Sequence, residues 1–136
     1  MDNHPRRAFL ESIQGAPLSK LIGMTIERAG DGEVQLRLPF DERLLNLGGP
    51  AAPVHGGAIA TLVDTAACAA VWTLPETVRS ATVSITVNYT SAAIQSDLIA
   101  VAKVRRKGKS LASVAIEVRD NRNSLIADGL VTYKIA

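Results

Sequence analysis

The sequence predicts an α+β fold in which an antiparallel sheet packs around one central helix. The first observation behind this prediction is that residues 56–74 place apolar side chains at helical spacing on nearly every side, as in a helix buried in a core. The second is that residues 82–135 alternate between apolar and polar side chains or form short apolar runs, as strands do.

Composition and charge exclude several classes of protein. The 136 residues suit a single domain, residues 1–136, and the 47% of them that are hydrophobic suffice for a core. A formal net charge of +2 does not suggest a nucleic-acid binder, which usually shows a strongly basic face. Cys68 is the only cysteine, so we expect neither an intrachain disulfide nor a zinc site. Because only 4% of the residues are aromatic, we expect a thinly packed core that needs a partner subunit.

No targeting or membrane segment is visible. Residues 1–7 include basic side chains but no apolar region follows them. The least polar stretch, residues 56–74, contains Asp64 and three threonines, which makes it too polar for a membrane span. We therefore expect a cytoplasmic protein that does not contact a membrane, in agreement with its lone reduced thiol.

The first half of the chain is predicted to contain two helices and a hairpin. Gly15 and Pro17 break the N-terminal helical pattern after about three turns. Asp31-Gly32 suits a hairpin turn that needs positive φ, and Pro75 ends the central helix. The predicted elements are an N-terminal helix within residues 5–21, strands at 24–28 and 33–38, a Gly- and Pro-rich loop at 39–54, and the central helix from residue 56.

The second half of the chain is predicted to consist of strands. Period-two alternation is clearest at residues 82–89 and again at 113–119. Residues 98–104 form an apolar run interrupted only by Lys103, and residues 120–123 have turn chemistry. A closing strand at residues 125–135 completes the predicted sheet.

Asp64 is the most informative residue for function, because it lies in the middle of the predicted central helix among apolar neighbours. An unpaired buried carboxylate costs roughly 3–5 kcal/mol, which a fold tolerates where the charge has a use. Alternatively, Asp64 lies on a solvent-facing stripe of the helix, although such a stripe normally carries Lys, Glu and Arg. The neighbours on this stripe are small and leave room for a ligand: Gly57, Ala60, Thr61 and Cys68.

The second candidate feature is His55-Gly56-Gly57, immediately before the central helix. Glycines let a ligand approach the backbone, and the unpaired N–H groups at a helix start can stabilise an oxyanion. His55 is alternatively a packing or capping residue. Gly56 and Asp64 are about 12 Å apart along the helix axis, so within a single subunit they cannot both contact the same carbonyl group. They could face each other across a two-fold axis where two such helices pack.

Residues 54–66, Val-His-Gly-Gly-Ala-Ile-Ala-Thr-Leu-Val-Asp-Thr-Ala, resemble the signature of hotdog-fold acyl-CoA thioesterases of the PaaI-like (phenylacetate-degradation) family. The strands that follow agree, so the resemblance covers about residues 21–135. It implies a hotdog fold, in which an antiparallel sheet of five to six strands wraps one long helix. It further implies a homodimer with one continuous sheet, pairing of dimers into tetramers, and active sites at the dimer interface.

The resemblance also implies roles for residues. Asp64 matches the catalytic acid, which serves as nucleophile or general base from the opposite subunit, and Gly56 matches the glycine whose N–H polarises the thioester carbonyl. His55 matches the histidine beside that glycine, and Gly57 is expected to bind substrate. Asn46 is the nearest match to an upstream asparagine, but residues 49–53 lengthen the loop beyond the family pattern and leave open whether Asn46 reaches the site. No metal or redox cofactor is implied, since CoA is part of the substrate.

Residues 105–110 form a basic run that we place in the turn between two strands. The run is either a solvated hairpin tip or a site for a polyanionic phosphate tail. It is not a P-loop, because position 103 is Lys and a strand follows instead of a helix. In hotdog thioesterases the equivalent turn meets the phosphates of coenzyme A. The residues that would bind CoA here are Arg105, Arg106, Lys107, Gly108, Lys109 and Ser110.

The leading hypothesis is an acyl-CoA thioesterase that hydrolyses a thioester to a carboxylic acid and free CoA. One alternative is a hotdog-fold enoyl-thioester hydratase or dehydratase, which usually pairs a histidine with an acid across the dimer. Another is a non-catalytic acyl-CoA-binding dimer. The specificity for the acyl group depends on the volume of a pocket that two chains would form together.

Overall fold

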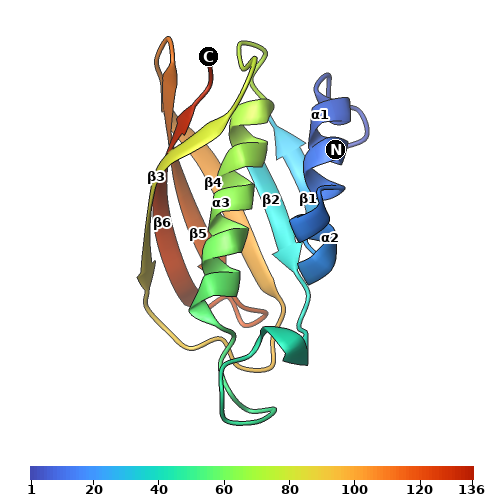
Figure 1. Ribbon diagram of the computed structural model, residues 1–136, viewed down its shortest axis with the longest axis vertical. Helices are drawn as coiled ribbons and strands as arrows, with labels where there is room; N and C mark the ends of the chain where they lie inside the picture. Colours follow the sequence, from blue (N-terminus) through green and yellow to red (C-terminus); the bar gives the residue numbers. More distant parts are fainter.

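One six-stranded antiparallel sheet curls around helix α3 (Gly56–Trp72) in the computed structural model, which describes residues 1–136 (Figure 1). The strands lie in the order β1-β2-β4-β5-β6-β3, so β1 and β3 are the two edges. The predicted α+β architecture of a sheet around one central helix is confirmed. The remaining elements are α1 (Arg7–Gln14), α2 (Pro17–Ile22), β1 (Thr25–Gly30), β2 (Glu33–Leu38), the 3-10 helix η1 (Glu42–Leu44), β3 (Ala81–Tyr89), β4 (Leu98–Lys107), β5 (Leu111–Arg119) and β6 (Leu125–Lys134).

Helix α3 forms the centre of the core. Its buried side chains are small or branched, and they lie against strands β2, β4, β5, β6 and β3. The close approach to β6 depends on Gly129, because a Cβ there would lie 2.8 Å from Cγ1 of Val63 and 3.3 Å from the carbonyl oxygen of Thr86. The helix ends at Trp72, three residues before Pro75. Its buried residues are Ile59, Leu62, Val63, Ala66, Ala67, Ala69, Ala70 and Val71.

The N-terminal segment contains two short helices where one helix within residues 5–21 is predicted. Helix α1 stops at Gly15, and Pro17 begins α2 at its first position, where a missing N–H costs nothing. Gly23, with a φ of 82°, then ends α2 in the left-handed region. The sequence predicts the break at Gly15 and Pro17 but not the second helix.

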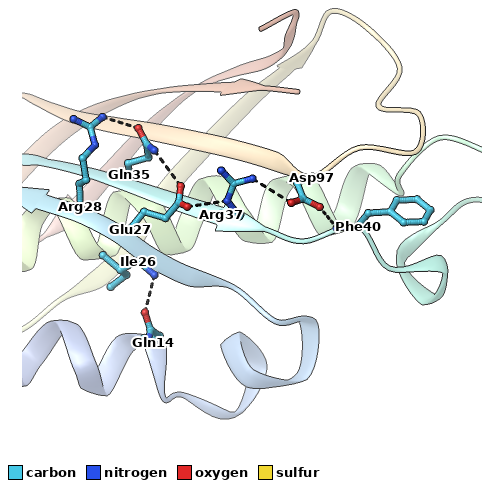
Figure 2. A network of polar contacts seen from close by, with 8 residues as sticks. All are labelled: Gln14, Ile26, Glu27, Arg28, Gln35, Arg37, Phe40 and Asp97. Atoms are coloured by element: carbon cyan, nitrogen blue, oxygen red, sulfur yellow. Dashed lines mark hydrogen bonds and ion pairs between the residues drawn. The ribbon is translucent and has the colours of Figure 1, made fainter. Parts of the chain in front are cut away.

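The loop that leads to the site is fixed at its start by polar contacts (Figure 2). Arg37 on β2 pairs with Glu27 at 2.8 Å and with Asp97 at 3.1 Å. The other carboxylate oxygen of Asp97 accepts a hydrogen bond of 2.7 Å from the backbone N–H of Phe40. These contacts join β1, β2 and the start of β4 at the point where residues 39–54 leave the sheet.

Strand β3 contains a bulge that reverses its alternation. Thr82 pairs with Tyr133 on β6, but the next pair along the strands is Ser84 with Thr132, so Val83 is an extra residue. Cross-strand partners share one face of a sheet. The bulge therefore turns Thr82 toward α3 together with Tyr133, whereas unbroken alternation would have placed it on the outer face with Ser84.

Strand β4 is longer than predicted. It extends to Lys107, so Arg105, Arg106 and Lys107 belong to the strand and only residues 108–110 form the turn to β5. The placement of the whole basic run in the turn was wrong. None of the helices is both long and apolar enough to cross a membrane.

The packing of α3 on β6 gives a stability prediction. Gly129→Ala should lower the free energy of unfolding by about 1–3 kcal/mol, because the added methyl group overlaps Val63 and a strand carbonyl. Gly30→Ala is the matched control, since a Cβ there lies 4.0 Å from its nearest neighbour. Urea unfolding of both variants tests the prediction, and equal stabilities would show that α3 does not need this close approach.

Candidate active site

Asp64 lies on the side of α3 that faces β3 and the end of β6. Two hydroxyl groups donate hydrogen bonds to its Oδ1 atom, Thr82 Oγ1 at 2.8 Å and Tyr133 Oη at 2.9 Å. The carboxylate is half-buried, so it is neither an unpaired core charge nor a freely solvated surface group. Its stripe along α3 consists of the small residues that the sequence predicts, and the structure shows that none of them is buried: Gly57, Ala60, Thr61 and Cys68.

Gly56 is the first residue of α3, and its backbone N–H makes no hydrogen bond within the chain. The hydroxyl of Tyr89, at the end of β3, donates a hydrogen bond of 2.7 Å to the carbonyl oxygen of Gly56. A Cβ on Gly56 would lie 3.3 Å from the Tyr89 ring. Tyr89 thus fixes the start of α3 while the Gly56 N–H, at the positive end of the helix, remains available to a ligand.

His55 caps the helix that it precedes. Its Nδ1 atom accepts a hydrogen bond of 2.8 Å from the backbone N–H of Gly57, which satisfies one of the free donors of the first turn. This contact agrees with the capping role considered for His55, and it occupies the Gly57 N–H. Of the two glycine N–H groups, only that of Gly56 is free for a substrate.

Asn46 remains close to Gly56 despite the longer loop. Its backbone N–H donates to the carbonyl oxygen of Pro53 at 2.9 Å, and Leu45 and Val54 form an antiparallel bridge. The extra residues therefore project outward as a small hairpin. Asn46 and Gly56 line one open pocket of about 430 Å³, and the other residues around it include Val54, Ile59, Tyr89 and Thr90.

The structure brings the predicted site residues into two groups. One group, Asn46, His55, Gly56 and Gly57, surrounds the N-terminus of α3, and the other consists of Asp64 with its hydroxyl partners. Gly56 and Asp64 occupy one straight helix, eight residues and about 12 Å apart along its axis. The chain alone does not form a site in which the two groups touch the same atom.

The basic run lies at the far end of α3 from Gly56. Lys107 pairs at 3.1 Å with Glu76, which follows the C-terminus of α3, and the Gly108 N–H closes the turn by donating to the carbonyl oxygen of Leu111. The other cationic side chains of the run are exposed and form no ion pair. This end of the molecule therefore presents three free positive charges: Arg105, Arg106 and Lys109.

Comparison with protein families decides the membership of the chain. The sequence model described as "Thioesterase superfamily" matches residues 53–127, which is more than half of the chain and includes all of α3 with His55, Asp64 and Thr82. The chain belongs to the thioesterase superfamily. This membership supports thioester hydrolysis in general, and the architecture is the hotdog fold.

Individual relatives agree with this membership. A protein of Halobacterium salinarum named "Putative esterase" is 42% identical over 104 residues, which cover 74% of this chain and 68% of the relative. A solved structure described as a thioesterase superfamily protein is 29% identical, with a TM-score of 0.85 over 93% of this chain and 95% of the other. A conserved protein from Pseudomonas aeruginosa is 30% identical, with a TM-score of 0.82 over 89% and 94% of the two chains.

Three residues of the site were not predicted from the sequence. Thr82 lies in a strand whose alternation assigns it to the outer face, and only the bulge at Val83 brings it to Asp64. Tyr133 and Tyr89 each follow a period-two pattern that places them on the inner face with apolar residues. A tyrosine at such a position usually finds a partner for its hydroxyl, which is a signal that could have identified both.

Proposed function

We propose that this thioesterase superfamily member hydrolyses acyl-CoA thioesters, as a PaaI-like enzyme, at two equivalent sites between the subunits of a homodimer. The observation that carries the proposal is the half-buried Asp64, held by two hydroxyl donors on a helix face of small residues. A carboxylate fixed in this way can act on a substrate that enters along that face. The reaction uses water as its only co-substrate and calls for no metal or redox cofactor.

Asp64 can drive hydrolysis by either of two routes. As a general base it takes a proton from water, and the resulting hydroxide attacks the thioester carbon. As a nucleophile, its carboxylate oxygen attacks that carbon directly to give a mixed anhydride, which water then hydrolyses. In both routes the carbonyl oxygen gains negative charge that the Gly56 N–H stabilises, the C–S bond breaks, and the CoA sulfur leaves and takes up a proton.

A dimer formed along β3 would complete the site. Strand β3 is an unpaired edge, and it exposes Val83, Ile85 and Tyr89. Antiparallel pairing of two β3 strands would extend the sheet across both subunits and lay two α3 helices side by side in opposite directions. The small-residue stripe allows that close approach, and the antiparallel arrangement places Gly56 of one subunit opposite the partner subunit's Asp64.

The same arrangement supports a role for the basic run in holding CoA. Within one chain the run lies at the opposite end of α3 from Gly56, but the two-fold axis would bring this end toward the Gly56 pocket of the other subunit. Arg105, Arg106 and Lys109 are free to pair with phosphate groups there, whereas Lys107 is already paired with Glu76. Gly108 and Ser110 lie in the turn that carries Lys109, whereas Arg105 and Arg106 belong to the end of β4. Two such dimers would in turn pair into a tetramer.

The proposal predicts that Asp64→Asn lowers kcat for thiol release from acyl-CoA by at least about a hundredfold, because the amide can neither accept a proton nor attack carbon. Panels of short, medium, long and aromatic acyl-CoAs should be assayed for thiol release, with enoyl-CoA hydration measured in parallel. Thermal unfolding of the variant checks that the fold is intact. Undiminished thiol release by a folded Asp64→Asn protein would disprove the role of Asp64, and CoA binding without turnover in the parent protein would indicate a binding module.

Gly56 offers a test of the oxyanion donor with a close control. Proline suits the first position of a helix, and His55, with φ −58° and ψ 133°, has the backbone that precedes proline. Gly56→Pro removes the N–H and should lower kcat about 10²–10³-fold. Gly56→Ala adds the same Cβ beside Tyr89 but keeps the N–H, so it should lose far less activity. Equal losses in the two variants would show that crowding, and not the N–H, accounts for the effect.

A further inference from the structure

The hydrogen bonds of Asp64 distinguish its two carboxylate oxygens. Thr82 and Tyr133 both donate to Oδ1, and no hydrogen bond from the chain reaches Oδ2. The two donors come from different strands, β3 and β6, which pair with each other at this point. Two donors on one oxygen fix the plane of the carboxylate and leave the lone pairs of the other oxygen free.

Tyr133 is built into the fold more firmly than Thr82. Its side chain is 4% exposed and packs in the hydrophobic core, and its hydroxyl also lies 3.2 Å from the backbone carbonyl oxygen of Asp64. Burial raises the pKa of the Tyr133 phenol well above its usual value, so the hydroxyl stays protonated and acts as a donor to the carboxylate. Thr82, by contrast, lies on the exposed edge strand.

We propose that Tyr133 is a positioning residue that, together with Thr82, holds Oδ1 of Asp64 so that Oδ2 is the oxygen that reacts. This inference rests on the proposed function of Asp64. In the base route Oδ2 takes the proton from water, and in the nucleophilic route Oδ2 forms the bond to the thioester carbon. Tyr133 acts through the orientation and charge of the carboxylate to which it donates.

The orientation role predicts a specific kinetic pattern for Tyr133→Phe. The variant keeps the ring in the core and loses only the hydroxyl, so kcat should fall about tenfold while KM changes less than about twofold. Because Tyr133 donates a hydrogen bond to the carboxylate, losing that bond should move the acid limb of the kcat profile to higher pH. Thr82→Val should move the limb in the same direction.

Tyr89→Phe is the matched control for loss of a tyrosine hydroxyl. The Tyr89 hydroxyl donates to the carbonyl oxygen of Gly56 and to no carboxylate, so its removal should leave the acid limb where it is. A purely structural role of Tyr133 would reduce stability without moving that limb. The pH profile therefore separates positioning from simple support of the fold.

The experiment measures thiol release from the best acyl-CoA of the substrate panel over a range of pH, with full-length parent, Tyr133→Phe, Thr82→Val, Tyr89→Phe and Asp64→Asn proteins. A lower kcat together with an acid limb moved upward in Tyr133→Phe, but not in Tyr89→Phe, supports the inference. An unmoved limb in a folded Tyr133→Phe protein overturns it while leaving Asp64 as the catalyst. If Tyr133→Phe does not fold, an unmoved limb in Thr82→Val overturns it. Full activity of Asp64→Asn would instead refute the proposed function.

Discussion

The rigidity of helix α3 is the constraint on which the candidate site depends. The helix carries the free N–H of Gly56 at its start and the carboxylate of Asp64 two turns later, and its buried face is locked into a curved sheet. A packed helix cannot bend to bring these groups together, so about 12 Å separates them along the axis in every copy of the chain. A site that uses both groups on one thioester carbonyl must therefore combine two copies.

The edge strand β3 has the features that pairing of two copies of the chain would need. The bulge in β3 turns Thr82 inward to hold Asp64, while Tyr89, at the other end of the strand, reaches the start of α3. One strand thus supports both ends of the proposed site and also presents the unpaired edge through which a second copy could join. The stripe of small residues beside Asp64 serves the same arrangement, because bulky or charged side chains there would keep two helices apart.

The sequence predicts most of the fold because side chains that face the core recur at a regular spacing in helices and strands. The apolar spacing of residues 56–74 and the alternation after residue 82 are direct consequences of which side chains face the core. Features that lack such a regular spacing of apolar side chains are not predicted. The end of β4 carries exposed charged side chains that bear no pattern of burial, α2 is too short to show a helical repeat, and the bulge at Val83 changes the face of Thr82 without changing its composition. Asp64 and Gly56 stand out because a carboxylate or paired glycines are unusual in a buried helix, whereas Tyr133 resembles any other aromatic residue of a strand.

Active-site complementation tests the shared site most directly. Differently tagged Asp64→Asn and Gly56→Pro chains are unfolded together, refolded, and purified as mixed dimers through both tags. In a mixed dimer one site contains both defects and the other contains neither, so the account predicts thiol release at about half the rate per dimer of the parent protein. Mixed dimers as inactive as the two single variants would contradict it, because they would show that Gly56 and Asp64 of the same chain serve each site.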